Sequence, residues 1–230
     1  MKILFIIYDN ESQRSNLPLG ILYLSSFLKK NGYTDIHFYN QDVYHYPAEH
    51  LTDYLNKNKF DIIGIGFAAG YFQHIKIQAI CSAIQRTKDK PFLALGGHGP
   101  TPVPEFYLRL TCADAVVMGE GEITFLNLVK AIENKQSLKK VKGIAFKKED
   151  QIIINNRETV IKDIENIPYP DLSHMPMEYY LKGQYFNMTA IDRKIQMITG
   201  RGCAYTCNFC QRLEKGMRLR PVDAVIDQIK

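Results

Sequence analysis

The stretch Asp61-Ile-Ile-Gly-Ile-Gly-Phe67 decides the fold class. It is a short run rich in β-branched residues, and an amphipathic stretch that predicts a long helix, about 72–87, follows it. Such runs alternating with amphipathic stretches are typical of parallel βα units. The two glycines inside the run allow another group to approach the strand backbone closely.

The same alternation extends from this stretch in both directions along the chain. It predicts strands at 1–8, 34–39, 61–67, 92–95 and 113–118, and helices at 18–31, 47–58, 72–87, 104–110 and 123–133. The first of these helices begins at Pro18 and is closed by Gly32, as helix-end preferences require. Residues 1–135 are therefore expected to form an α/β domain, a Rossmann-like doubly wound parallel sheet of five strands.

The chain changes character after residue 135. Residues 142–147 and 151–155 alternate about the polar turn Lys148-Glu-Asp150 and predict a β-hairpin, and a proline- and tyrosine-rich linker follows. We assign residues 136–193 to this hairpin and linker. A strand at 194–198, a cysteine-containing loop and a helix at 221–230 then form a third region, 194–230.

Composition excludes several classes of protein. Of 230 residues, 46% are apolar and 23% are charged, and the net charge of +5 is spread over many short Lys and Arg pairs. We therefore expect no nucleic-acid partner. The first apolar run stops at Asp9, too short to span a membrane. Five cysteines, three of them clustered, indicate a reducing compartment such as the cytoplasm.

The three clustered cysteines are Cys203, Cys207 and Cys210, in the spacing C-x-x-x-C-x-x-C. Three thiolates leave one iron of a four-iron cubane open for a small molecule. A structural zinc site is the alternative, but it requires four ligands. The other two cysteines, Cys81 and Cys112, are expected in helices, packed as small apolar residues.

The run Arg201-Gly-Cys-Ala-Tyr-Thr-Cys-Asn-Phe-Cys210 resembles the cysteine loop of the radical S-adenosylmethionine (SAM) enzymes. The resemblance implies that Cys203, Cys207 and Cys210 hold a [4Fe-4S] cluster whose open iron is capped by SAM, with Phe209 in the cofactor site. It further implies a low-potential electron donor such as flavodoxin or ferredoxin as a partner.

Glycines follow the third, fourth and fifth predicted strands, at the sheet edge where doubly wound folds bind ligands. The segments Pro18–Leu24, Asp61–Ile65, Gly96–His98 and Val117–Glu122 together resemble the N-terminal domain of the cobalamin (B12)-dependent radical SAM family. The resemblance implies bound cobalamin. The residues that it places beside the cofactor are Gly66, Gly96, Gly97, His98, Gly119, Glu120 and Gly121.

One departure from the family concerns the cobalt ligand. Many cobalamin domains carry Asp-x-His-x-x-Gly after the first strand, whereas this chain has Asp9-Asn-Glu-Ser-Gln-Arg14. Bound cobalamin is therefore expected to be base-off and without a histidine ligand. His45 follows the second predicted strand instead and is expected at the surface.

The expected function is that of the N-terminal part of a cobalamin-dependent radical SAM enzyme, methyltransferase-like, driving radical methyl transfer or a related rearrangement or cyclisation. A radical SAM core needs about six βα units, and at roughly 30 residues for each βαβ step the tail after Cys210 supplies only one. The chain is thus expected to be truncated and too short to be active alone. The alternative is a catalytically inactive cobalamin- or partner-binding module left by truncation.

Overall fold

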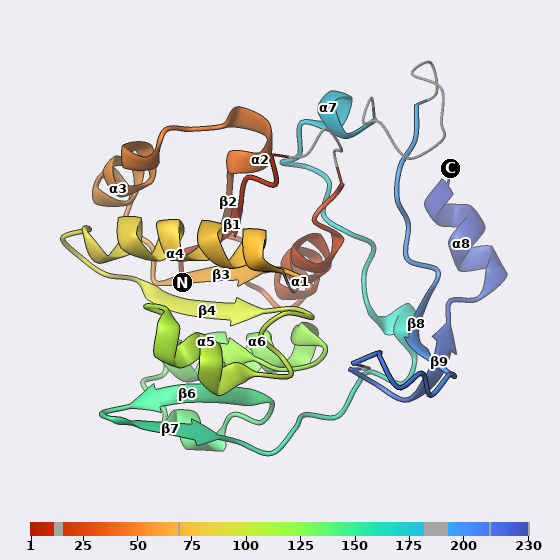
Figure 1. The fold of residues 1–230 in the computed structure, drawn as a ribbon. Coiled ribbons are helices and arrows are strands. Elements are labelled where there is room, and N and C mark those ends of the chain that lie inside the picture. Colours follow the sequence, from red (N-terminus) through yellow and green to blue (C-terminus); the bar gives the residue numbers. More distant parts are fainter. Residues whose placement is uncertain (12–15, 69, 182–192, 212, 230) are drawn as a thin grey trace.

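The fold is built on a seven-stranded sheet. A computed structural model describes residues 1–11, 16–68, 70–181, 193–211 and 213–229. The sheet order is β2-β1-β3-β4-β5-β6-β7, and β1 to β5 run parallel (Figure 1). The parallel strands are β1 (Ile3–Ile7), β2 (Ile36–Asn40), β3 (Ile62–Gly66), β4 (Phe92–Gly96) and β5 (Ala115–Val117). The prediction of a doubly wound α/β fold is confirmed.

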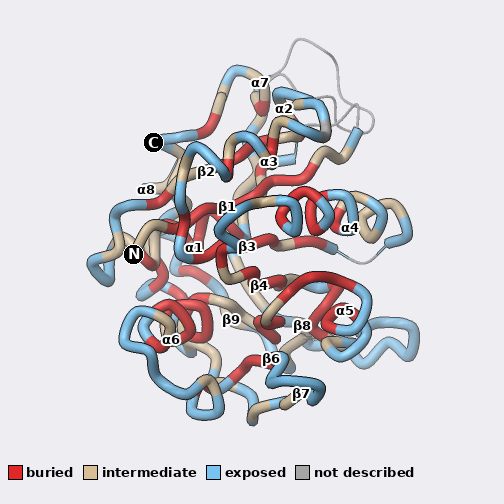
Figure 2. Tube along the Cα trace, turned by 90° about the vertical axis from the view of Figure 1, so that its left-hand side faces the viewer, coloured by how far each residue is buried: buried red, intermediate tan, exposed pale blue. Residues whose placement is uncertain are grey.

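Helices cover both faces of the sheet. One face packs against α1 (Leu19–Lys30) and α6 (Gly121–Glu133), and the other against α3 (Ala48–Lys57), α4 (Tyr71–Gln85) and α5 (Pro104–Leu110). Side chains of β1 alternate between the two cores, as the period of a strand requires: Leu4 and Ile6 enter one, and Phe5 and Ile7 the other. Figure 2 shows the buried segments concentrated in the strands and the inner helix faces.

The glycine in the middle of β3 has a packing reason. A Cβ built on Gly64 would lie 2.7 Å from the Phe5 ring, so any larger residue would push that ring away. Phe5 in turn contacts Phe125 of α6, with ring centroids 5.5 Å apart. The close approach expected at this strand is therefore made by a neighbouring aromatic ring.

The predicted hairpin forms, but it is part of the sheet. Strands β6 (Ile144–Lys148) and β7 (Gln151–Ile154) pair with each other, and β6 also pairs antiparallel with β5. The five predicted parallel strands are confirmed, but the hairpin, which was expected to follow the sheet, extends it past residue 135 by two antiparallel strands. The physical reason is that the apolar start of β6 is buried against the otherwise open edge of β5.

The remaining described elements include α2 (Gln41–Tyr44), the 3-10 turns 138–140 and 164–166, and α7 (Met177–Leu181). The last part of the predicted linker, 182–192, lies outside the described residues. Residues 194–198 form no strand, which corrects the prediction; β8 (Gly200–Cys203) pairs instead with β9 (Gly216–Leu219), and α8 (Val222–Ile229) follows. No helix in the described ranges is long and apolar enough to cross a membrane.

Candidate functional site

Three loops meet where β3, β4 and β5 end, and we call this rim the carboxyl edge. Gly99 N donates to Phe67 O at 3.1 Å, which joins the loops after β4 and β3. The Thr101 hydroxyl donates to Gly97 O at 2.7 Å and accepts from Gly119 N at 3.1 Å, which joins the loops after β4 and β5. The glycine-rich segments singled out from the sequence therefore form one connected rim.

Two of these glycines are required by the backbone itself. Gly97 has φ +97°, and a Cβ there would lie 2.6 Å from Phe67 O. Gly119 has φ +79°, in the left-handed region that favours glycine. These positions therefore have a structural reason to be glycine, while their contact with a cofactor stays a prediction.

The other predicted cofactor residues occupy the same edge. Gly66 and Gly96 are register partners at the ends of β3 and β4. His98 is exposed. Glu120 lies at the N-cap of α6 and Gly121 begins that helix. The structure therefore brings the whole predicted set to one rim.

The clustered cysteines lie on β8 and in the loop that connects it to β9, and we call the two strands with this loop the cysteine hairpin. Cys203 ends β8 opposite Gly216, and Cys207 and Cys210 are exposed in the loop. Gly202 has φ +87°, and a Cβ on it would collide with Gly216 O across the hairpin. The Gly-Cys entry of the motif is thus required for the two strands to pair.

A hollow of about 480 Å³ lies beside Cys210, lined also by Arg157, Leu213, Glu214 and Lys215. Phe209 is 89% exposed. Within the described ranges, no group of three or more His, Cys, Asp or Glu side chains is arranged to hold a metal ion. The structure therefore gathers the three cysteines in one loop without bringing their thiols to a common point.

Four charged residues fasten the cysteine hairpin to the carboxyl edge, and we call them the charged joint: Glu120, Glu122, Arg201 and Arg218. Arg201 Nη2 donates to Glu122 Oε1 at 2.6 Å, and Arg218 Nη1 donates to Glu120 Oε2 at 3.1 Å. Arg201 Nη1 also lies 3.6 Å from Glu120 Oε2. The side chains of Glu120, Arg201 and Arg218 are each 15% exposed, and that of Glu122 is 5% exposed.

A buried tyrosine lies beneath this joint. Tyr23 of α1 is completely buried, with the guanidinium carbons of Arg201 and Arg220 at 5.2 and 5.7 Å from its ring centroid. Arg220 also donates to Ile167 O at 3.0 Å. Burial opposes the charge of Arg201, but Glu122 and Glu120 outweigh it and raise the pKa of that guanidinium. The hairpin therefore rests on an aromatic platform supplied by the sheet domain.

The other two cysteines are remote from the hairpin. Both are buried, and Cys112 Sγ donates to Cys81 O at 3.6 Å. Cys81 lies in α4 as predicted, but Cys112 lies in the turn after α5, because that helix ends at Leu110. The hydrogen bond with Cys81, together with burial, raises the pKa of Cys112, so its thiol stays protonated.

His45 is about half exposed and has φ +45° at the end of α2. Its Nδ1 lies 3.2 Å from Asp9 Oδ1, in the segment that follows β1. The histidine therefore comes from the loop after β2 but lies beside the loop after β1. Residues 12–14 of the departing motif lie outside the described residues.

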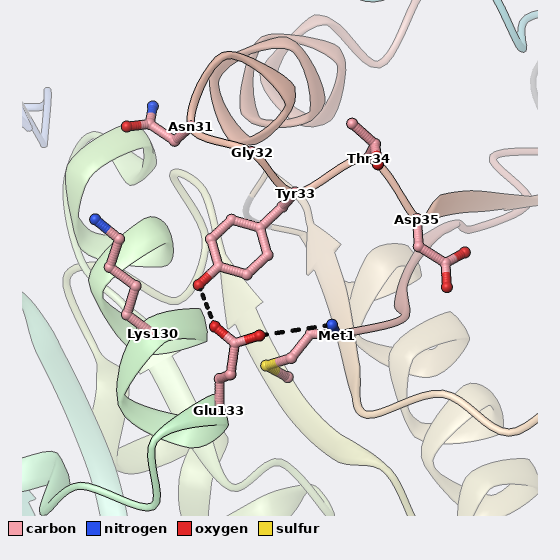
Figure 3. A pocket seen from close by; sticks show the side chains of 8 residues that line it. All are labelled: Met1, Asn31, Gly32, Tyr33, Thr34, Asp35, Lys130 and Glu133. Carbon is pink, nitrogen blue, oxygen red and sulfur yellow. Dashed lines mark hydrogen bonds and ion pairs between the residues drawn. The ribbon is translucent and has the colours of Figure 1, made fainter.

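A separate pocket of about 300 Å³ lies at the opposite edge of the sheet, beside Met1 and the loop that precedes β2 (Figure 3). Glu133 accepts there from the Tyr33 hydroxyl at 2.6 Å and lies 3.7 Å from the Met1 amine. Burial and Glu133 raise the pKa of Tyr33 to about 12. This pocket shares no residue with the carboxyl edge.

Sequence reasoning missed the charged joint and Tyr23. Opposite charges beside two glycine-containing motifs were the available signal: Glu120 and Glu122 flank Gly121, and Arg201 precedes Gly202. Nothing in the local sequence, however, indicates that these motifs pair with each other.

A family model described as "B12 binding domain" matches residues 10–129, and the chain belongs to that family. The uncharacterized methyltransferase PH0819 of Pyrococcus horikoshii is 28% identical, over 100% of this chain and 50% of the relative. An anaerobic magnesium-protoporphyrin IX monomethyl ester cyclase of Rubrivivax gelatinosus is 27% identical, over 100% of this chain and 42% of the relative. The chain thus spans about half the length, or less, of these relatives.

Solved structures of cobalamin-dependent radical SAM enzymes share the fold. OxsB, solved with aqua-cobalamin and SAM bound, superposes with a TM-score of 0.77 at 25% identity, over 99% of this chain and 30% of OxsB. TsrM from Kitasatospora setae, a radical SAM methyltransferase solved with cobalamin and a [4Fe-4S] cluster, gives 0.71 at 17% identity, over 100% and 45%. The second likeness concerns the fold alone.

Proposed function

We propose that the chain works within a cobalamin-dependent radical SAM enzyme, holding cobalamin at the carboxyl edge and a [4Fe-4S] cluster on the cysteine hairpin. The observation that carries this proposal is the ion pair between Glu120 and Arg218, because it joins the two candidate sites directly. OxsB, which superposes over nearly the whole chain, is described with cobalamin and SAM bound, and this supports the proposal.

The three thiols of the hairpin are the donor type that an iron–sulfur cluster requires, although they do not meet at one point in the structure without the cluster. Cys203, Cys207 and Cys210 would supply three thiolates, and the exposure of the last two leaves them accessible to iron and sulfide. A cluster so held supplies one-electron cleavage of SAM, and cobalamin supplies a transferable methyl group. The role of the hairpin itself is to hold and orient, with Phe209 beside the bound cofactors.

We place a large ligand at the carboxyl edge because the loops there are rich in glycine and carry few side chains. The predicted contacts are those of Gly66, Gly96, Gly97, His98, Gly119, Glu120 and Gly121. Of these, Glu120 already binds Arg218, so we assign to its carboxylate the fastening of the hairpin and to its backbone the cofactor contact. We propose that cobalamin binds base-off and without a histidine ligand.

The proposed reaction is radical methyl transfer or a related cyclisation, with a low-potential donor such as flavodoxin or ferredoxin supplying electrons. Relatives described as methyltransferases and as a cyclase support both reactions. The test is anaerobic reconstitution with iron, sulfide and hydroxocobalamin, followed by metal analysis and absorption spectra of the desalted protein. We expect about four irons per chain, lost in Cys203→Ala but kept in Cys112→Ala, and a retained base-off corrin spectrum.

Corrin retained without iron would leave a cobalamin-binding module, the alternative function. Zinc with neither cofactor would overturn the proposal.

A further inference from the structure

Within the charged joint, two arginines of the hairpin lie close together, and the carboxylates that neutralise them come from a distant part of the sequence. Arg201 and Arg218 are register partners, directly opposite each other on β8 and β9. Like charges in that arrangement repel, and among the described residues no third strand pairs with this hairpin. The hairpin therefore needs carboxylates from elsewhere to neutralise its two guanidinium groups.

Glu120 and Glu122 supply those carboxylates from the start of α6. Glu120 is the N-cap residue and Glu122 lies in the first turn, positions where the helix dipole favours negative charge. Each carboxylate binds one arginine, and Glu120 also approaches the other. Because all four side chains are largely buried, loss of one partner leaves an uncompensated charge in the interface.

The contacts of the charged joint prevent the cysteine hairpin from rotating against the carboxyl edge as well as from separating from it. Two ion pairs made from opposite strands fix the hairpin at two points, and the contact of Arg201 with Tyr23 adds a third. Arg218 Nη1 also donates to Ile161 O at 2.7 Å, in the segment that passes beside the hairpin. Arg201 lies two residues before Cys203, so a fixed Arg201 fixes the entry to the cysteine loop.

We propose that Glu120 and Glu122 are positioning residues that set where the cysteine loop lies relative to the carboxyl edge. Neither carboxylate needs to touch a cofactor for this role, because each acts through an arginine of the hairpin. The inference rests on the proposed function in one respect, namely that the cysteines hold a cluster. The ion pairs that hold the hairpin in place form without any bound cofactor.

The test is hydrogen–deuterium exchange of the full chain without cofactors, followed by reconstitution. In Glu122→Gln, and in Glu120→Arg, we expect amides of 200–203 and 216–219 to exchange at least about tenfold faster, while β3 and β4 are unchanged. The double variant Glu120→Arg with Arg218→Glu restores an attractive pair and should bring exchange back toward the wild-type rate. Glu105→Gln, in an exposed ion pair of α5, is the matched control and should change nothing.

Reconstitution adds a second measurement, which a general change in stability would not alter. At equal iron content, the electron paramagnetic resonance spectrum of the reduced cluster should differ from wild type in Glu122→Gln and in Glu120→Arg. It should return to the wild-type spectrum when Glu120→Arg is combined with Arg218→Glu. Unchanged hairpin exchange in both single variants, or failure of the swap to restore the spectrum, would overturn the proposal. A third outcome is faster exchange in the variants while the wild-type chain itself takes up no iron. This would support the positioning role of the two glutamates and refute the proposed cluster.

Discussion

Lys29 Nζ lies 2.6 Å from Asp171 Oδ2, which ties the linker to α1 across most of the chain. The Ser25 hydroxyl donates to the same oxygen at 2.6 Å. Burial opposes ionisation of Asp171, but hydrogen bonds from Lys29, Ser173 and Ser25 outweigh it and hold the pKa at about 2. The linker is therefore fastened by a carboxylate that remains ionised well into acid.

This pKa predicts a pH-dependent contribution to stability. An Asp with a pKa lowered from 3.8 to about 2 stabilises the folded state above pH 4, and the contribution is lost as the pH falls toward 2. Urea unfolding of Asp171→Asn should show a loss of about 1–2 kcal/mol at pH 7, reduced by solvent screening, that disappears near pH 2. Asp53→Asn, at an exposed position of α3, is the control; an equal pH dependence in both variants would contradict the assignment.

Two glycine-to-alanine substitutions test whether iron uptake depends on the hairpin or on the sheet domain. Gly202→Ala should disrupt the cysteine hairpin, because the added Cβ collides with Gly216 O and the left-handed backbone is strained. Iron uptake should fall severely while circular dichroism of the sheet domain is kept. Gly20→Ala, with open space at the start of α1, should leave iron uptake intact and raise stability by up to about 1 kcal/mol. Normal iron uptake by Gly202→Ala would show that the hairpin is not needed.

Tyr23 offers a test of the platform. Among the described residues its hydroxyl has no hydrogen-bond partner, so Tyr23→Phe keeps the ring and should leave the free energy of unfolding unchanged or raise it by about 1 kcal/mol. Tyr23→Ala opens a cavity and removes both arginine contacts, and should lower it by about 3–5 kcal/mol. Chemical denaturation measures both; similar losses in the two variants would mean that the hydroxyl, rather than the ring, is what matters.

The proposal that cobalamin binds without a histidine ligand predicts that neither His45 nor His98 determines the absorption spectrum of the bound corrin. His45→Ala and His98→Ala should give the absorption spectrum of the wild-type complex with hydroxocobalamin. His45 is the sharper case, because it lies against Asp9 beside the end of β1. A spectral change in one variant alone would identify a histidine ligand and correct the proposal.

The sheet domain could be predicted because its signals are local. Each buried strand is a short apolar run, and residues such as Pro104 and Gly32 signal where helices begin and end. The junction could not be predicted, since its contacts join distant residues: Arg201 and Glu122 are 79 positions apart, and Arg218 and Glu120 are 98 apart. The pairing of β6 with β5 and the absence of a strand at 194–198 have the same origin, because a strand needs a partner as well as a pattern.

The burial of Tyr23 also orders the assembly of the molecule in time. Synthesis produces α1 early, but the groups that cover its outer surface come from Ile164, Ile167, Arg201 and Arg220. Until they emerge, the nascent domain presents an aromatic surface to the solvent or to a chaperone. The final position of the cysteine hairpin therefore depends on a surface that the sheet domain supplies from a much earlier part of the chain.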